Sequence, residues 1–186
     1  LRRADARSIT LALNEVDNTG FEGVGYDRAG DRLFVVKEHS PRKLYEIHGI
    51  KRSLAGDMDI KIIDRQAWID KLDMASDLSS VHFDEQTGHL VLLSDEAKMM
   101  LELDAEGELV SFRSLWRGFA GLERSVPQAE GMTFDAQGNL YLVSEPNLFY
   151  SFRREEGQPE YHEPEEQQDE ITKLSMTEKR HRMIHG

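Results

Sequence analysis

A phrase of about twenty residues that occurs three times places the strongest constraint on the fold. The copies read "FEGVGYDRAGDRLFVVKEHS" at 21–40, "DLSSVHFDEQTGHLVLLSDE" at 77–96 and "QAEGMTFDAQGNLYLVSEPN" at 128–147. Their alignment places Glu22, Ser79 and Glu130 in one column, so the unit recurs at intervals of roughly 50 to 60 residues. This interval is longer than that of common helical repeats and near that of the blades of β-propellers.

Each copy has the composition of a β-hairpin. Short runs rich in β-branched and aromatic residues, such as residues 33–36 and 140–143, follow turns rich in Asp, Gly and Asn. Asp27, Asp84 and Asp135 open these turns, where an Asp side chain accepts hydrogen bonds from nearby backbone N–H groups. We therefore interpret these three acids as structural turn residues.

The second repeat predicts a complete meander, with strands at about 79–83, 90–94, 99–104 and 109–115. Four strands of one meander form one blade of a propeller. The first repeat predicts the same unit, followed by a short helix in "RQAWIDKLDM", whereas the third predicts only three strands. We expect "SITLALN" at 8–14 to be an orphan outer strand that completes a blade.

The fold class predicted is therefore all-β, a β-propeller of four-stranded antiparallel blades within residues 1–156, with repeats starting at 22, 79 and 130. Three blades are fewer than the about four to eight that surround a central channel, so we expect an incomplete set from a larger propeller. The alternative is a compact three-sheet protein that completes itself by self-association. Residues 157–186 form an acidic and then basic tail, for which we expect disorder or a short helix.

Charge and composition exclude several classes of function. The formal net charge of −12 disfavours a phosphate backbone, so no nucleic-acid partner is expected. The chain has no cysteine, which excludes disulfides, zinc–thiolate sites and thiol catalysis. No run approaches the ~20 apolar residues of a membrane span, and the chain begins with Leu1 rather than Met. Membrane contact is expected only through an N-terminal anchor preceding this sequence.

Several segments resemble the SdiA-regulated family, also called the YjiK/CarP family. They are "NTGFEGVGYD", "RLFVVKE", "DLSSVHFDEQTGHLVLLSDEAK", "SLWRGFAGL" and "SVPQAEGMTFDAQGNLYLVSEPNLFYSF", and the resemblance covers about residues 15–153. It implies a bacterial propeller of about five or six blades, in the periplasm and anchored to the inner membrane. One branch of the family is linked to calcium homeostasis, and phytase-like activity has been suggested by analogy of fold. The chain departs from the family in Ser79 and in its tail.

The paired Glu-Gly sequences predict a metal site. The first strand of each blade is innermost, so Glu22 and Glu130 are expected to converge at a channel, where Ca²⁺ relieves carboxylate repulsion. Gly23 and Gly131 are expected to let the neighbouring backbones approach closely near the axis. Lactonase-type propellers, which these pairs resemble, use such a glutamate as a metal ligand. The alternative is a solvated glutamate or one paired with Arg32 or Arg113.

Three further acids are ligand candidates of second rank, because they close the second strand of each repeat: Glu38, Asp95 and Glu145. His82 lies on an expected inner strand, and we interpret it as a packing residue because no Ser-His-Asp pattern accompanies it.

Two classes of function follow. The first is a periplasmic, calcium-binding propeller that binds a small molecule or a protein partner. The second is a metal-dependent hydrolase of phytase-like or lactonase-like type that uses the channel cation. No nucleophile or general base is identifiable from the sequence, so whether the protein is an enzyme stays open and binding is favoured.

Overall fold

The computed structural model of the chain describes residues 8, 20–38, 41–57 and 59–154. The expected outer strand at 8–14, apart from Ser8, and the expected tail at 157–186 lie outside the described residues.

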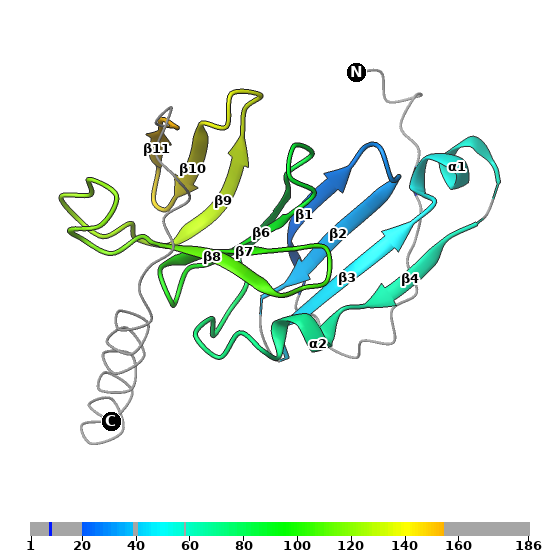
Figure 1. Cartoon of the computed structure of the whole chain (residues 1–186), viewed down its shortest axis with the longest axis horizontal. Coiled ribbons are helices and arrows are strands. Elements are labelled where there is room, and N and C mark those ends of the chain that lie inside the picture. Colours follow the sequence, from blue (N-terminus) through cyan, green and yellow to red (C-terminus); the bar gives the residue numbers. More distant parts are fainter. Residues whose placement is uncertain (1–7, 9–19, 39–40, 58, 155–186) are drawn as a thin grey trace. The chain divides into compact units, whose positions relative to one another are not determined.

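Three antiparallel sheets account for most of the described residues (Figure 1). The first sheet has the order β1 (Phe21–Asp27), β2 (Arg32–Lys37), β3 (Lys43–His48), β4 (Lys61–Asp64). The second has the order β5 (Ser80–Phe83), β6 (Leu90–Ser94), β7 (Met99–Leu103), β8 (Leu109–Ser114). The third contains β9 (Ala129–Phe134), β10 (Leu140–Ser144) and β11 (Leu148–Phe152), with β10 in the middle.

The predicted hairpins are confirmed, and each sheet is a meander in which consecutive strands pair. The short helix expected after the first meander is α2 (Gln66–Ile69). A second helix, α1 (Ile50–Ala55), lies between β3 and β4 and was not predicted. It begins after Gly49 and ends at Gly56, and both glycines adopt the left-handed conformation that favours this residue. Because α1 occupies this connection, β4 begins only at Lys61.

The first strands of the meanders lie side by side, β1 beside β5 and β5 beside β9. The approach of β1 and β5 is so close that a Cβ atom added to Gly23 would lie 2.7 Å from the Cα atom of Ser80. Gly23 is therefore required for the contact, as its sequence position predicts. Gly131 is different. A Cβ atom added to Gly131 would lie nearest to Cγ2 of Val143, which belongs to the same sheet. The predicted close approach of a neighbouring strand at Gly131 is therefore not observed among the described residues.

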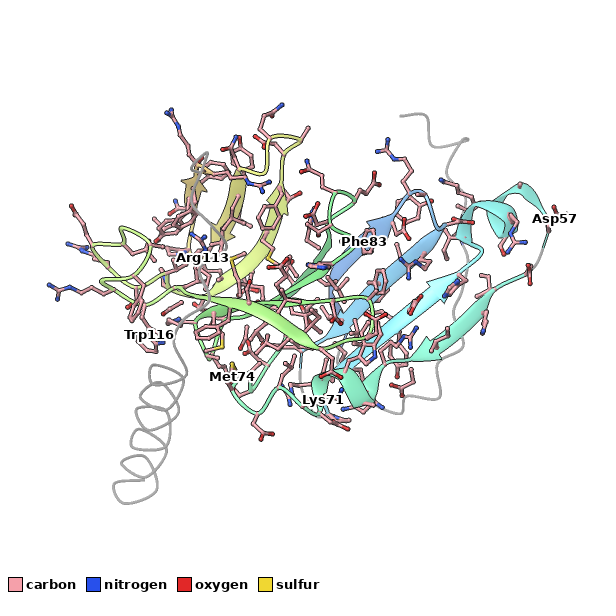
Figure 2. All side chains as sticks on the ribbon, in the orientation of Figure 1. Asp57, Lys71, Met74, Phe83, Arg113 and Trp116 are labelled. Atoms are coloured by element: carbon pink, nitrogen blue, oxygen red, sulfur yellow. The ribbon has the colours of Figure 1, made fainter. Side chains whose placement is uncertain are left out.

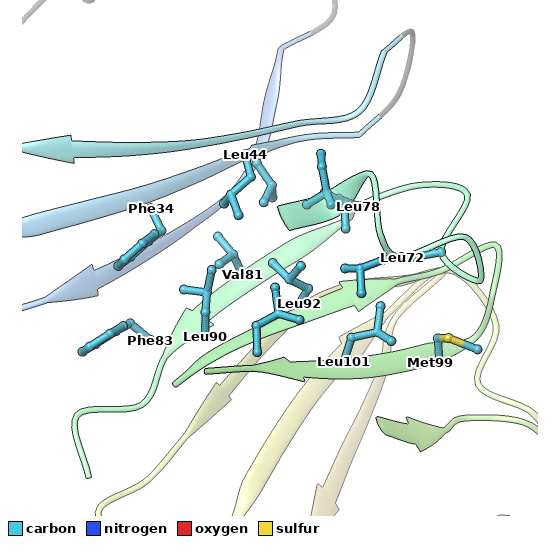
Figure 3. Close-up of a cluster of buried hydrophobic side chains, with 14 residues drawn as sticks. Phe34, Leu44, Leu72, Leu78, Val81, Phe83, Leu90, Leu92, Met99 and Leu101 are labelled. Carbon is cyan, nitrogen blue, oxygen red and sulfur yellow. The ribbon is translucent and has the colours of Figure 1, made fainter. Parts of the chain in front are cut away.

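Two apolar cores join the three sheets. The first core lies between the first and second sheets, where Phe34 stacks on Phe83 with 5.5 Å between ring centroids (Figure 3). The second core lies between the second and third sheets and includes Leu93, Val126 and Leu142. Four-stranded antiparallel meanders that pack face to face, with their first strands adjacent, are the blades of a β-propeller.

Candidate functional site

Both glutamates of the Glu-Gly pairs lie at β-bulges. In β1 the register shifts between Phe21 and Gly23, so Glu22 has no residue opposite it in β2. In β9 the two neighbours of Glu130 pair with consecutive residues of β10, so Glu130 is also an extra residue. A bulge turns a side chain out of the regular alternation of a strand and is frequent next to functional sites. Sequence reasoning missed both bulges, although the Glu-Gly pair is a signal that could have indicated them.

The register of the hairpins places all five candidate acids at one end of the sheets. The start of each inner strand lies opposite the end of the second strand of the same hairpin. Three of the acids directly follow a second strand: Glu38 after β2, Asp95 after β6 and Glu145 after β10. They are therefore at the same end of the sheets as Glu22 and Glu130, which lie at the start of inner strands. The sequence left open at which end these three acids lie.

The other four acids act electrostatically on Glu130. The pKa of Glu130 is raised above its ordinary value, first by partial desolvation of its exposed side chain and then by the negative charges of Asp95, Glu145, Glu38 and Glu22. The four neighbours that raise this pKa are the other members of the predicted set. Glu130 is therefore in a field that favours a proton or a cation beside it.

Backbone contacts tie two of the acids to the next blade. The carbonyl oxygen of Glu38 accepts a hydrogen bond of 3.1 Å from the N–H group of Leu78, directly before β5. Oδ1 of Asp95 accepts a hydrogen bond of 2.8 Å from the N–H group of Ala129, at the start of β9, and lies 3.2 Å from Nζ of Lys98. The carboxylate of Asp95 therefore has a structural role that the sequence did not indicate.

The arrangement does not itself form a metal-ligand shell. Among the described residues, no three His, Asp or Glu side chains are close enough together to hold a metal ion. Carboxylate oxygens are the donors that Ca²⁺ prefers, so the chemistry of the side chains suits this ion although their spacing does not. The described residues therefore supply a negative field around Glu130 but not the spacing of a metal site.

The arginines considered as partners of these glutamates lie elsewhere. Arg32 is at the opposite end of its hairpin and forms ion pairs with Asp27 at 2.7 Å and Glu46 at 3.3 Å. Arg113 lies on β8, the strand of the second sheet farthest from its inner strand (Figure 2). Glu22 is exposed, as in the solvated alternative.

A family model with the description SdiA-regulated matches residues 1–153. The chain belongs to the SdiA-regulated family. Two solved structures are also similar to it. One is the crystal structure of a nidogen/laminin complex, at 14% identity over 70% of this chain and 43% of that chain, with a TM-score of 0.48. The other is virginiamycin B lyase from Staphylococcus aureus, at 10% identity over 75% of this chain and 43% of that chain, with a TM-score of 0.43. The chain thus spans less than half the length of either.

Asp77 is a further residue at the acidic end of this SdiA-regulated propeller that sequence reasoning missed. Its side chain is fully buried and accepts hydrogen bonds from the hydroxyl of Ser94 and from the N–H groups of Asp95 and Glu96. These contacts fix the loop that carries Asp95. The other two repeats have Gly20 and Gln128 at the equivalent position, so no repeated pattern marks it.

The remaining predicted residues have structural surroundings. Asp27, Asp84 and Asp135 accept hydrogen bonds from backbone N–H groups within their turns, which confirms their assignment. His82 packs on Phe134 with 5.1 Å between ring centroids, and burial lowers its pKa. A histidine whose charged form is disfavoured in this way suits the packing role that we predicted.

Proposed function

We propose that this SdiA-regulated propeller is a binding protein whose acidic end takes a cation, with Ca²⁺ as the first candidate. The observation that carries the proposal is the shared register of the hairpins. It gathers two bulged glutamates and three strand-ending acids at one end of adjacent blades. The negative charges of the other four acids raise the pKa of Glu130, and a hard cation with oxygen ligands would supply a compensating charge there.

The members of the set have different roles in the proposal. Asp95 is held by Lys98 and Ala129, so it contributes mainly negative charge. Glu22, Glu130 and Glu145 are exposed, and their side chains can rotate toward a common ion. Ca²⁺ commonly takes about six to eight oxygen ligands, so water and residues beyond the described part of the chain would complete the shell.

A small molecule or a protein partner is the proposed ligand of the same end, in the periplasm of a bacterium. The location and an inner-membrane anchor rest on the resemblance to family members. Within the part of the chain that the structure describes, no helix is long and apolar enough to cross a membrane. We place binding ahead of metal-dependent hydrolysis because His82, the histidine of the inner strands considered for catalysis, packs against Phe134.

Thermal melting with Ca²⁺ and with a chelator tests the proposal. A ligand that binds only the folded state adds about 2.7 kcal/mol of stability at a hundred times its dissociation constant. We expect Ca²⁺ to stabilise the natural sequence by this order and to have little effect on the Glu22→Gln/Glu130→Gln variant. Without metal, this variant should be no less stable, because replacing the charges relieves repulsion.

A matched control separates the site from the overall charge. The Glu106→Gln/Glu123→Gln variant loses the same charge at two exposed positions outside the set and should keep the response to Ca²⁺. Equal stabilisation of both double variants by Ca²⁺, or no stabilisation of the natural sequence, contradicts the proposal.

A further inference from the structure

A buried carboxyl group connects the segment before β5 with the turn after β6. Asp77 is fully buried and accepts hydrogen bonds from the hydroxyl of Ser94 and from the N–H groups of Asp95 and Glu96, the last two at 3.0 Å and 3.1 Å. It is the acceptor in all three contacts, which is the hydrogen-bonding pattern of an ionised carboxyl group. A buried charge is costly, and these three donors are what compensate for it here.

The third sheet ends the equivalent hairpin strand without such a charge. Ser144 is the equivalent of Ser94, and its hydroxyl donates to the backbone carbonyl oxygen of Pro127. A neutral carbonyl group therefore serves in the third sheet as the acceptor that the carboxyl group of Asp77 provides in the second. The charge of Asp77 is thus more than the closure of the hairpin requires.

The turn that Asp77 holds makes the contact with the third sheet. Oδ1 of Asp95 accepts a hydrogen bond of 2.8 Å from the N–H group of Ala129, the first residue of β9. Ala129 directly precedes Glu130, the extra residue of the β-bulge. Two successive steps of hydrogen bonding therefore lead from Asp77 through Asp95 to the backbone beside Glu130.

The residue after Asp77 makes a contact with the first sheet. The N–H group of Leu78 donates to the carbonyl oxygen of Glu38 at 3.1 Å. Asp77 and Leu78 thus bind the backbone of two of the acids, Glu38 and Asp95, and Asp95 leads to Glu130. A displacement of this segment would move acids of all three sheets relative to one another.

We propose that Asp77 is a positioning residue of the acidic end, which fixes the turn of Asp95 and, through the carboxylate of Asp95, the start of β9 and Glu130. Because its side chain is fully buried, Asp77 acts through Asp95 and not on a ligand. Residues that orient the ligands of a metal without binding it commonly have a strong influence on metal affinity. The consequence for Ca²⁺ rests on the proposed function, whereas the positioning of β9 does not.

Hydrogen exchange of the Ala129 amide tests the positioning without a metal. Asp77→Asn keeps the shape of the side chain but replaces one acceptor oxygen with an NH₂ donor, so the turn loses a hydrogen bond. The amide of Val126, which donates to the carbonyl oxygen of Leu115 at 3.0 Å, is the internal reference. We expect the ratio of the Ala129 rate to the Val126 rate to rise about tenfold. Global destabilisation alone would raise both rates and leave the ratio unchanged, and an unchanged ratio overturns the proposal.

A double-mutant cycle establishes whether the effect passes through Asp95. Asp95→Ala removes the acceptor of the Ala129 N–H group and should raise the same ratio. Adding Asp77→Asn to Asp95→Ala should then have little further effect, and an effect that adds in full overturns the proposal. If Asp77→Asn does not fold, Ser94→Ala removes one of the three donors and should raise the ratio by less; no increase overturns the proposal.

Titration calorimetry with Ca²⁺ tests the consequence for binding. Asp77→Asn should bind Ca²⁺ about tenfold more weakly than the natural sequence. The control Ile47→Val alters a fully buried residue near the opposite end of the first sheet and should keep the natural affinity. Binding of Ca²⁺ to the natural sequence with unchanged affinity in Asp77→Asn overturns the role of Asp77 in cation binding. If the natural sequence binds no Ca²⁺, the proposed function is wrong, and the exchange of the Ala129 amide alone decides the role of Asp77.

Discussion

Glu130 is an exposed carboxylic acid whose pKa is raised by the charges of four other acids. Partial desolvation adds to this increase, whereas the pKa of Glu46 on the first sheet is lowered. Burial alone would raise the pKa of Glu46, but the hydrogen bonds and charges of Arg65 and Arg32 outweigh it and lower the pKa. Glu46 is thus a paired structural acid, and Glu130 is an acid without such compensation from an arginine among the described residues. The sequence identified Glu130 as a candidate but contained no sign of the buried role of Glu46.

The raised pKa of Glu130 predicts a specific dependence of stability on pH. The folded state binds the proton of Glu130 more tightly than the unfolded state, so this contribution is fully present below the ordinary value of 4.5. It is lost as the pH rises through the raised pKa. We expect Glu130→Gln to match the natural sequence in stability at low pH and to exceed it at neutral pH in the absence of metal.

Denaturant unfolding of both proteins across this pH range measures the difference. The control Glu106→Gln, at an exposed turn, should show no such divergence. A Glu130→Gln variant that is less stable than the natural sequence at neutral pH would show that the carboxylate makes a stabilising contact.

At the scale of elements, short runs of β-branched and aromatic residues, with turns rich in Asp, Gly and Asn between them, were sufficient to predict the hairpins. The Glu-Gly pairs were a hint of the β-bulges but did not locate them, because a bulge depends on the hydrogen-bond register between two strands. Register also decided at which end Glu38, Asp95 and Glu145 lie. The helix α1 was missed because its six residues are too few to show a helical period.

The contact between β1 and β5 predicts a difference between two nearby glycines. Gly23→Ala should destabilise the protein by about 1–3 kcal/mol, since the added methyl group meets the backbone of β5 and forces the strands apart. Gly20→Ala should change the stability by less than about 0.5 kcal/mol, because nothing lies within 4 Å of its added Cβ. Equal free energies of unfolding for the two variants would contradict the close packing of the inner strands.

At the scale of the whole molecule, the repeat predicted the blades, and the structure shows how their inner strands and cores follow one another. The sequence could not show which faces stay open, because Val36, Leu93 and Val143 are equivalent apolar residues in it and differ only in what covers them. For the same reason, the number of blades in a closed propeller does not follow from the composition of any one repeat.

A pH titration of Glu130 tests most directly whether the acidic end acts as one cation-binding group. NMR of the side-chain carboxyl carbon of Glu130 measures its pKa. We expect the pKa of Glu130 to lie above the ordinary 4.5. This pKa should fall in a Glu145→Gln variant, because one repelling charge is removed. Added Ca²⁺ should lower it further, while Mg²⁺, which demands a stricter geometry, should have less effect. If Glu130 titrates at its ordinary value and its pKa responds neither to Glu145→Gln nor to Ca²⁺, the acidic end is not a cation-binding group.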